Sequence, residues 1–179
     1  MQELQKEIPN CHFVEHSRFR AMVNMFINIF SACPFQVAYY NNKQLMARLK
    51  SLKQEQNFDL VYTHLIRMVP YARMFRKTKV ILDYTDCISL EYSRSLDHLS
   101  GIRKLFFRIE SARTSRYEMK VANLFSENWV ISQVDLQKLG LKEHHLSKVL
   151  PNQVRIPPNE ADSSLKMRLI FTGNMSVPH

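Results

Sequence analysis

Lys79-Val80-Ile81-Leu82-Asp83-Tyr84 is a short, almost continuous run of apolar and β-branched residues, and Phe58-Asp59-Leu60-Val61-Tyr62-Thr63 has the same character one segment upstream. Asn128-Trp129-Val130-Ile131-Ser132 is a third run, and Ser147-Lys148-Val149-Leu150 is a shorter fourth. Runs of this length are typical of strands that are covered on both faces, as in a parallel sheet. We therefore predict four parallel strands.

Helical patterns lie between these runs. Asn41-Asn42 can cap a helix in which Leu45, Leu49 and Leu52 form one stripe. A second helix is predicted over 66–76, and the longest begins after Ser100-Gly101 and ends by Phe125. Strands separated by helices imply right-handed crossovers. The predicted fold class is α/β, with a Rossmann-like, doubly wound parallel sheet.

The longest predicted helix has an apolar stripe and basic residues on its other faces. We expect the stripe to face the core, and it consists of Ile102, Leu105, Ile109, Ala112, Met119 and Ala122. The basic residues are Arg103, Lys104, Arg108, Arg113, Arg116 and Lys120. Solvated surface charge is the simplest reading of them, and contact with anionic lipid is the alternative.

The two ends of the chain differ from the middle. Met1 to Asn10 is predicted to be a polar helical tail that leads into a strand-like His12-Phe13-Val14. Proline, asparagine and serine make residues 151–167 a linker, and 168–179 reads as a strand that enters a glycine turn. We thus divide the chain into a sheet domain (1–150), the linker, and the start of a second domain (168–179).

Composition limits the class of protein. Lys and Arg total 25 against 16 Asp and Glu, and the resulting net charge of +9 favours phosphate-bearing partners. A specific nucleic-acid interface is not predicted, because no groove-entering motif or aromatic platform accompanies the charge. Cys11, Cys33 and Cys87 lack zinc-site spacing and suit a reducing cytosol, so no metal site is expected. The apolar stretch 21–35 is shorter than the roughly 20 residues that span a bilayer.

Several segments, in this order, resemble one family. They are 58–68, 80–89, Glu110-Ser111-Ala112-Arg113, Tyr117-Glu118, Val130-Ile131-Ser132, Leu150-Pro151-Asn152 and Phe171-Thr172-Gly173-Asn174-Met175. Together they resemble the family 4 (group 1) glycosyltransferases of the GT-B fold, in particular bacterial sugar transferases of exopolysaccharide assembly. One departure is that the linker reads Pro151-Asn152-Gln153-Val154-Arg155 where the family usually has Pro-Asn-Gly-Val-Asp.

The resemblance implies a parent enzyme that transfers a sugar from a nucleotide-sugar donor to a saccharide or lipid-linked acceptor. Residues 1–150 would be an incomplete acceptor-side domain, and 168–179 would open the donor-side domain, with Gly173 and Asn174 in the turn beside the donor diphosphate. No metal or other cofactor is implied. The implied location is the cytoplasm, peripheral on the inner membrane face. Most of the donor half is missing by this comparison, so we expect this chain alone to be inactive.

Candidate acceptor-side residues follow the strands, because ligands of open α/β sheets bind beyond the carboxyl ends of the strands. Asp86 follows the second strand and either caps the next helix or accepts a hydrogen bond from a sugar hydroxyl. His64 follows the first strand, where it either binds substrate or packs. Asp83 is expected to orient the loop, and Arg67, one helical turn after His64, to pair with a sugar or phosphate oxygen. Asp86 and His64 are the catalytic candidates, and Arg67 and Asp83 the substrate-binding ones.

Glu110 and Glu118 have the Glu-x7-Glu spacing that this family uses for the donor, but they lie on the wrong domain, so we expect salt bridges to Arg113 or Arg116 instead. Two rival functions remain. One is a non-catalytic basic protein that binds phosphate-bearing or membrane surfaces. The other is a phospho-acceptor domain that uses Asp83 and Asp86, although it lacks the acidic cluster and the matching lysine that such domains need.

Overall fold

Four strands pair in parallel, in the order in which they occur along the chain. The computed structural model describes residues 10–141 and 147–151. Its strands are β1 (Leu60–His64), β2 (Lys79–Asp83), β3 (Glu127–Val130) and β4 (Ser147–Val149), in the order β1-β2-β3-β4. The α/β class and the parallel sheet are therefore confirmed, with strand bounds within about two residues of those expected.

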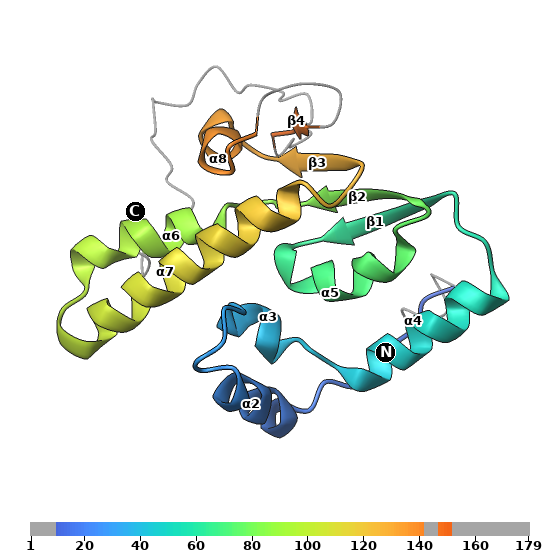
Figure 1. Ribbon diagram of the computed structural model, residues 1–179, viewed down its shortest axis with the longest axis horizontal. Helices are drawn as coiled ribbons and strands as arrows, with labels where there is room; N and C mark the ends of the chain where they lie inside the picture. Colours follow the sequence, from blue (N-terminus) through green and yellow to red (C-terminus); the bar gives the residue numbers. More distant parts are fainter. Residues whose placement is uncertain (1–9, 142–146, 152–179) are drawn as a thin grey trace, which may run out of the picture.

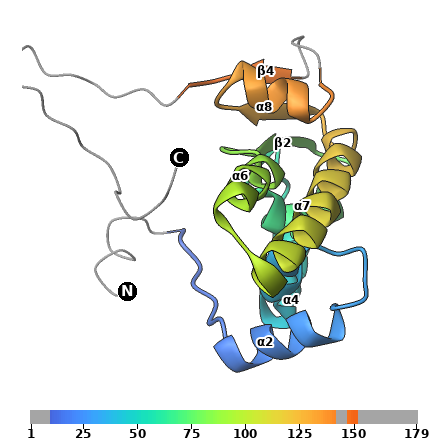
Figure 2. The same ribbon diagram turned by 90° about the vertical axis from the view of Figure 1, so that its left-hand side faces the viewer.

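Helices connect the strands and precede the first one (Figure 1). In chain order they are α2 (Arg18–Ile27), α3 (Phe35–Tyr39), α4 (Lys43–Glu55), the 3₁₀ turn η1 (Ile66–Met68), α5 (Val69–Ala72), η2 (Arg73–Phe75), α6 (Ile88–Ser95), η3 (Leu96–His98), α7 (Gly101–Ala122) and α8 (Gln133–Lys138). Figures 1 and 2 agree that α2 and α4 lie at the end of the molecule opposite β4 and α8.

The doubly wound arrangement is not found among the described strands. A doubly wound sheet needs a reversal of strand order, whereas the order here is strictly sequential. Right-handed crossovers that all proceed in one direction place their helices on the same face of the sheet. We therefore expect the two faces of the sheet to differ in how well they are covered.

The two faces of the sheet differ in burial. Val80 and Leu82 of β2 and Val130 of β3 are buried on one face, where Leu82 and Val130 join the main core with Ile66, Val69, Val121 and Leu136. On the other face Leu60, Tyr62 and Lys148 are exposed, whereas Ile81 and Glu127 in the middle of that face are buried. The expectation that every strand is covered on both faces is therefore wrong for β1 as far as the described residues go.

The predicted helices are found with changes. The Asn42 side chain caps α4 by accepting from the amides of Gln44 and Leu45, as expected. The single helix predicted over 66–76 is broken into η1, α5 and η2, and Leu65 before it has a φ of 70°. Residues 11–17 form neither helix nor strand, so the strand predicted at His12-Phe13-Val14 is wrong.

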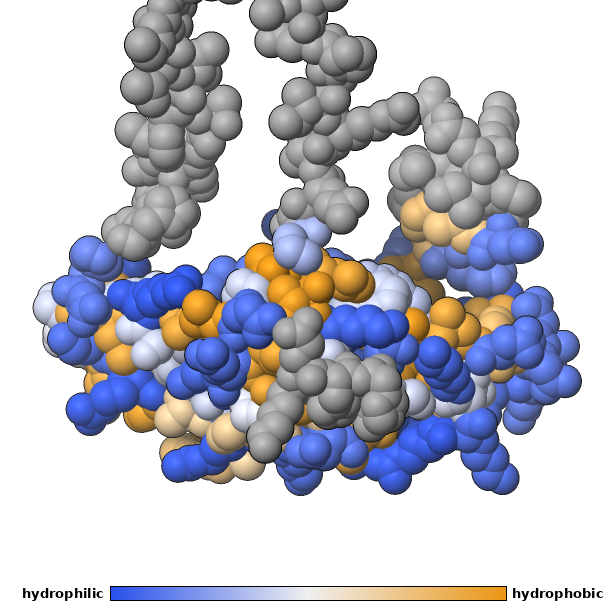
Figure 3. Space-filling model, turned by 90° about the horizontal axis from the view of Figure 1, so that it is seen from above, coloured by the Kyte–Doolittle hydropathy of each residue, from blue (hydrophilic) through white to orange (hydrophobic). Residues whose placement is uncertain are grey.

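α7 turns the predicted stripe outward. Ile102, Leu105, Ile109 and Met119 are exposed, while Glu110, Thr114 and Glu118 are buried together with Val121 and Ala122. Only Ala122 of the expected core-facing stripe is therefore fully buried. Apolar side chains also reach the surface elsewhere, and Figure 3 shows hydrophobic groups in orange among hydrophilic ones in blue.

Candidate functional site

The carboxyl ends of β1 and β2 bring His64 and Asp83 together. The two residues are direct register partners at the ends of neighbouring parallel strands. Nδ1 of His64 lies 3.2 Å from Oδ2 of Asp83, and 54% of the His64 side chain is exposed. Two of the predicted site residues thus form a pair that solvent can reach.

Asp83 is held by further donors. The Tyr62 hydroxyl donates to Asp83 Oδ2, and the Thr85 amide donates to Asp83 Oδ1 at 2.9 Å. Burial alone would raise the pKa of Asp83, but the hydrogen bonds from Tyr62, Thr85 and His64 together outweigh it and lower the pKa. The carboxylate is therefore ionised at neutral pH, and it orients the loop as expected.

The backbone on each side of this pair has an unusual conformation. Leu65, which follows His64, has a φ of 70°, and Thr85, two residues after Asp83, has a φ of 58°. Positive φ is uncommon for residues other than glycine, and it is found preferentially at ligand sites and turns. The Leu65 amide also donates to the Asp83 carbonyl at 2.7 Å, which joins the two strand ends.

Asp86 lies in the turn before α6 but does not cap that helix. The N-cap position of α6 is Cys87, and no side chain there makes a cap hydrogen bond. Burial, followed by the nearby charge of Asp135, raises the pKa of Asp86. The capping role considered for Asp86 is therefore wrong, and its carboxyl group is available for other contacts.

Arg67 points to a different neighbour. Its guanidinium carbon lies 4.5 Å from the centre of the Tyr40 ring, a cation–π geometry that links η1 to the end of α3. Arg67 is thus positioned by Tyr40, and it forms no ion pair within the part of the chain that the structure describes.

A second cluster of charges lies on the sheet face that carries Tyr62, around the buried side chain of Glu127. Glu127 accepts from Lys148 at 2.6 Å, from Lys79 at 3.2 Å and from Trp129 Nε1 at 2.7 Å. Hydrogen bonds from Lys148 and Trp129 lower the pKa of Glu127 to about 2. The Trp129 ring lies 5.8 Å from that of Tyr62, so this cluster borders the His64–Asp83 pair.

Of the two helix glutamates, one pairs as expected. Glu110 forms a salt bridge to Arg113 at 3.2 Å. Glu118 has no such arginine, because it is buried and accepts from the Ser89 amide at 3.3 Å and from Cys87 Sγ at 3.2 Å. The salt bridge predicted for Glu118 is therefore wrong. Burial and the charge of Glu118 raise the pKa of Cys87 to about 12, so this cysteine remains a thiol.

Tyr62, Thr85 and Asp135 were missed by sequence reasoning. The Asp135 carboxylate accepts from the Cys87 amide at 3.2 Å, and the Asp135 amide donates to Ser132 Oγ at 3.2 Å, so Asp135 ties α8 to the turn that carries Asp86. The spacing Ser132-x-x-Asp135 resembles a capping box, and this signature would have predicted Asp135 in the first turn of a helix. Tyr62 could also have been predicted, because it lies two residues before His64 on the same strand and therefore on the same face of the sheet.

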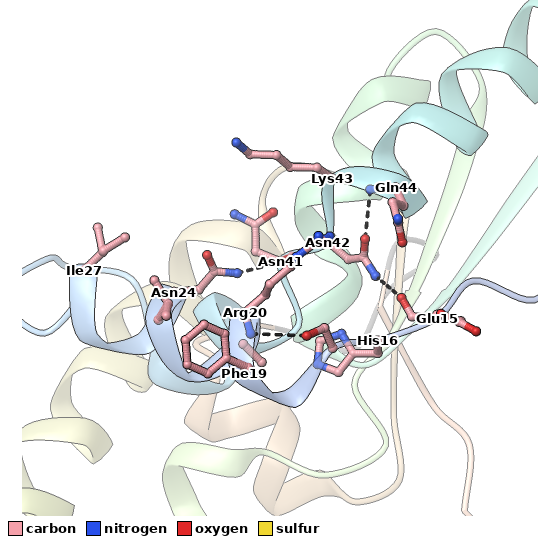
Figure 4. A pocket seen from close by; sticks show the side chains of 13 residues that line it. Glu15, His16, Phe19, Arg20, Asn24, Ile27, Asn41, Asn42, Lys43 and Gln44 are labelled. Carbon is pink, nitrogen blue, oxygen red and sulfur yellow. Dashed lines mark hydrogen bonds between the residues drawn. The ribbon is translucent and has the colours of Figure 1, made fainter.

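Other parts of the prediction fall elsewhere. Gly173, Asn174, residues 152–167 of the linker and the segment 168–179 lie outside the described residues. A cavity of about 870 Å³ is not at the strand ends but between α2 and the residues around Asn42 (Figure 4). Within 10–141 and 147–151, no group of three or more His, Cys, Asp or Glu residues is arranged to hold a metal ion.

Comparison with protein-family models, curated proteins and solved structures found no match to this chain. In the part of the chain that the structure describes, no helix is both long enough and apolar enough to cross a membrane.

Proposed function

We propose that this chain is the acceptor-side lobe of a GT-B glycosyltransferase, which acts with a nucleotide-sugar donor and a saccharide or lipid-linked acceptor in surface polysaccharide synthesis. The observation that supports it best is the His64–Asp83 contact at the carboxyl ends of adjacent parallel strands, the usual ligand position of open α/β sheets. The sequence motifs around both residues support it independently.

The pair suits activation of a hydroxyl group. An ionised Asp83 can only accept, so Nδ1 of His64 must carry the hydrogen that it shares with Asp83. Nε2 then keeps its lone pair and can take the proton of an acceptor hydroxyl. As that oxygen bonds to the anomeric carbon of the donor, the bond to the diphosphate breaks and the nucleotide diphosphate leaves.

Asp86 and the donor side complete the proposal. Asp86, whose pKa is raised, would accept a hydrogen bond from another hydroxyl of the bound sugar. Gly173 and Asn174 would present backbone N–H groups to the leaving diphosphate, and no metal is assigned a role. The proposed location is the cytoplasmic face of a membrane that holds the lipid-linked acceptor.

Binding of a saccharide tests this proposal directly, because the acceptor-side residues are all among those that the structure describes. Calorimetric titration would use neutral and acidic disaccharides together with UDP-, GDP- and dTDP-linked sugars. We expect at least one saccharide to bind, and Asp83→Asn and His64→Ala to weaken it by about tenfold or more.

Asp97 and His98 supply matched controls, since they are an exposed aspartate and histidine on η3. Asp97→Asn and His98→Ala should leave binding unchanged. Absence of saccharide binding to the unaltered chain, or equal losses in the control variants, would refute the acceptor-lobe proposal.

A further inference from the structure

Helix α2 and the turn that follows it expose apolar side chains to solvent. Phe19, Phe26 and Phe30 are 77%, 74% and 99% exposed, and Met22, Val23 and Ile27 are exposed as well. At 3.6 residues per turn, Phe19, Met22, Val23 and Phe26 fall on one stripe of the helix, and Phe30 lies in the turn just after it. We call these residues, together with Ile27, the α2 apolar face.

The orientation of α2 is fixed by its other side. Ala21 is buried, and Asn24 Nδ2 donates to the Asn41 carbonyl at 2.8 Å. Ser17 caps the first turn by accepting from the Arg20 amide. Ala21 and Asn24 thus face the rest of the protein. Their contacts fix the rotation of α2, and this rotation exposes the apolar stripe to solvent.

Basic residues flank this face. Arg18 and Arg20 lie at its two edges and are exposed, and α2 contains no acidic residue. Glu15 precedes the helix, and Figure 4 shows it beyond His16, away from Phe19. Arg20 and Lys43 also line the 870 Å³ cavity beside Val23 and Ile27, together with Glu15, so that two cations and one carboxylate belong to its lining.

Helix α7 contacts the turn after α2 and the first residue of α3. Arg113 of α7 donates to the Ile29 carbonyl at 2.8 Å, and Phe35 stacks on Phe106 with ring centres 5.4 Å apart. These contacts hold α7 beside the residues that follow α2. In the first half of α7 the exposed side chains are apolar or basic, and they include Ile102, Leu105, Arg103, Lys104 and Arg108.

We propose that the α2 apolar face inserts into the surface of an anionic phospholipid bilayer, with α2 lying in the plane of the membrane. An apolar stripe edged by arginines is the pattern of interfacial helices, and a helix of 10 residues is too short to span a bilayer. A second copy of the chain fits this face poorly, since each copy carries a net charge of +9 and the same basic edges. The inference specifies the surface by which the proposed membrane location would be reached, and its test does not depend on sugar binding, so the two proposals can fail separately.

Vesicle co-sedimentation tests this proposal with the full chain and no sugar present. We expect binding to vesicles of phosphatidylcholine mixed with phosphatidylglycerol, and much weaker binding to phosphatidylcholine alone. Phe26→Glu with Phe30→Glu should reduce the binding by at least about tenfold. Arg18→Gln and Arg20→Gln should each reduce it by about fivefold and make it less dependent on salt.

The control is Leu60→Ser, which removes an exposed apolar side chain from β1 and should leave vesicle binding unchanged. Circular dichroism would check that each variant keeps its helices. Because the substituted phenylalanines are exposed in the free protein, loss of folding is not expected.

Depth of insertion gives a second readout. The chain has one tryptophan, so Phe30→Trp in a Trp129→Phe background places a single fluorophore on the α2 apolar face. Brominated phospholipid should quench it on binding. The proposal is overturned if the chain ignores anionic vesicles, if the introduced indole is not quenched, or if light scattering shows dimers that Phe30→Glu dissociates.

Discussion

Nδ1 of His64 lies 3.2 Å from Oδ2 of Asp83, across two neighbouring strands that run in the same direction. Because Asp83 is ionised, the contact requires the hydrogen on Nδ1 and therefore selects one imidazole tautomer. Long-range ¹⁵N NMR of the neutral imidazole form should show the hydrogen of His64 on Nδ1. In Asp83→Asn the preference should be lost, and an Nε2–H tautomer in the unaltered chain would contradict the assignment.

Glu127 should make stability depend on pH in the acid range. Its folded pKa of about 2 is below the ordinary value of 4.5, so its contribution is present above pH 4.5 and is lost as the pH falls toward 2. We expect Glu127→Gln to lower the free energy of unfolding by on the order of 2 kcal/mol at pH 7. Urea unfolding at pH 7 and near pH 2 would measure this, and the difference between the two proteins should shrink at the lower pH.

Glu118 should have the opposite effect. Burial raises its pKa above the ordinary value, so its stabilising contribution is present below that value and is lost as the pH rises through the folded pKa. Glu118→Gln keeps an acceptor for the Ser89 amide but cannot ionise. The variant should therefore be at least as stable as the unaltered chain near pH 8 and gain nothing near pH 4. A large loss of stability near pH 8 would show that a charged Glu118 stabilises the fold.

The uneven covering of the sheet predicts unequal costs for two leucines. Leu82 of β2 is 0% exposed and Leu60 of β1 is 48% exposed. Leu82→Ala should cost about 3 kcal/mol of unfolding free energy, and Leu60→Ala less than about 0.5 kcal/mol. Equal costs, measured by urea unfolding, would mean that both faces are buried in solution.

Strand positions could be predicted because runs such as 79–84 are short, apolar and rich in β-branched residues, and the strand-end rule then led to His64 and Asp83. The facing of α7 could not. Ile102, Leu105 and Ile109 repeat with helical spacing, but so do Glu110, Thr114 and Glu118.

Tertiary contacts decided between these two stripes of α7. Glu118 satisfies the Ser89 amide and Glu110 the Phe35 amide, and both partners are distant in sequence. Likewise, periodicity does not reveal whether one or both faces of β1 are covered, since Leu60 and Tyr62 fit either arrangement.

A buried cysteine lies at the contact between α6 and α7, and its reactivity can report when the two helices separate. Cys87 is 1% exposed, with its thiol bonded to Glu118, whereas Cys11 and Cys33 are partly accessible. A thiol-specific alkylating reagent should therefore label Cys11 and Cys33 in the closed protein and reach Cys87 only when the two helices separate. The labelling rate at Cys87 would then measure how often α6 and α7 separate by local opening.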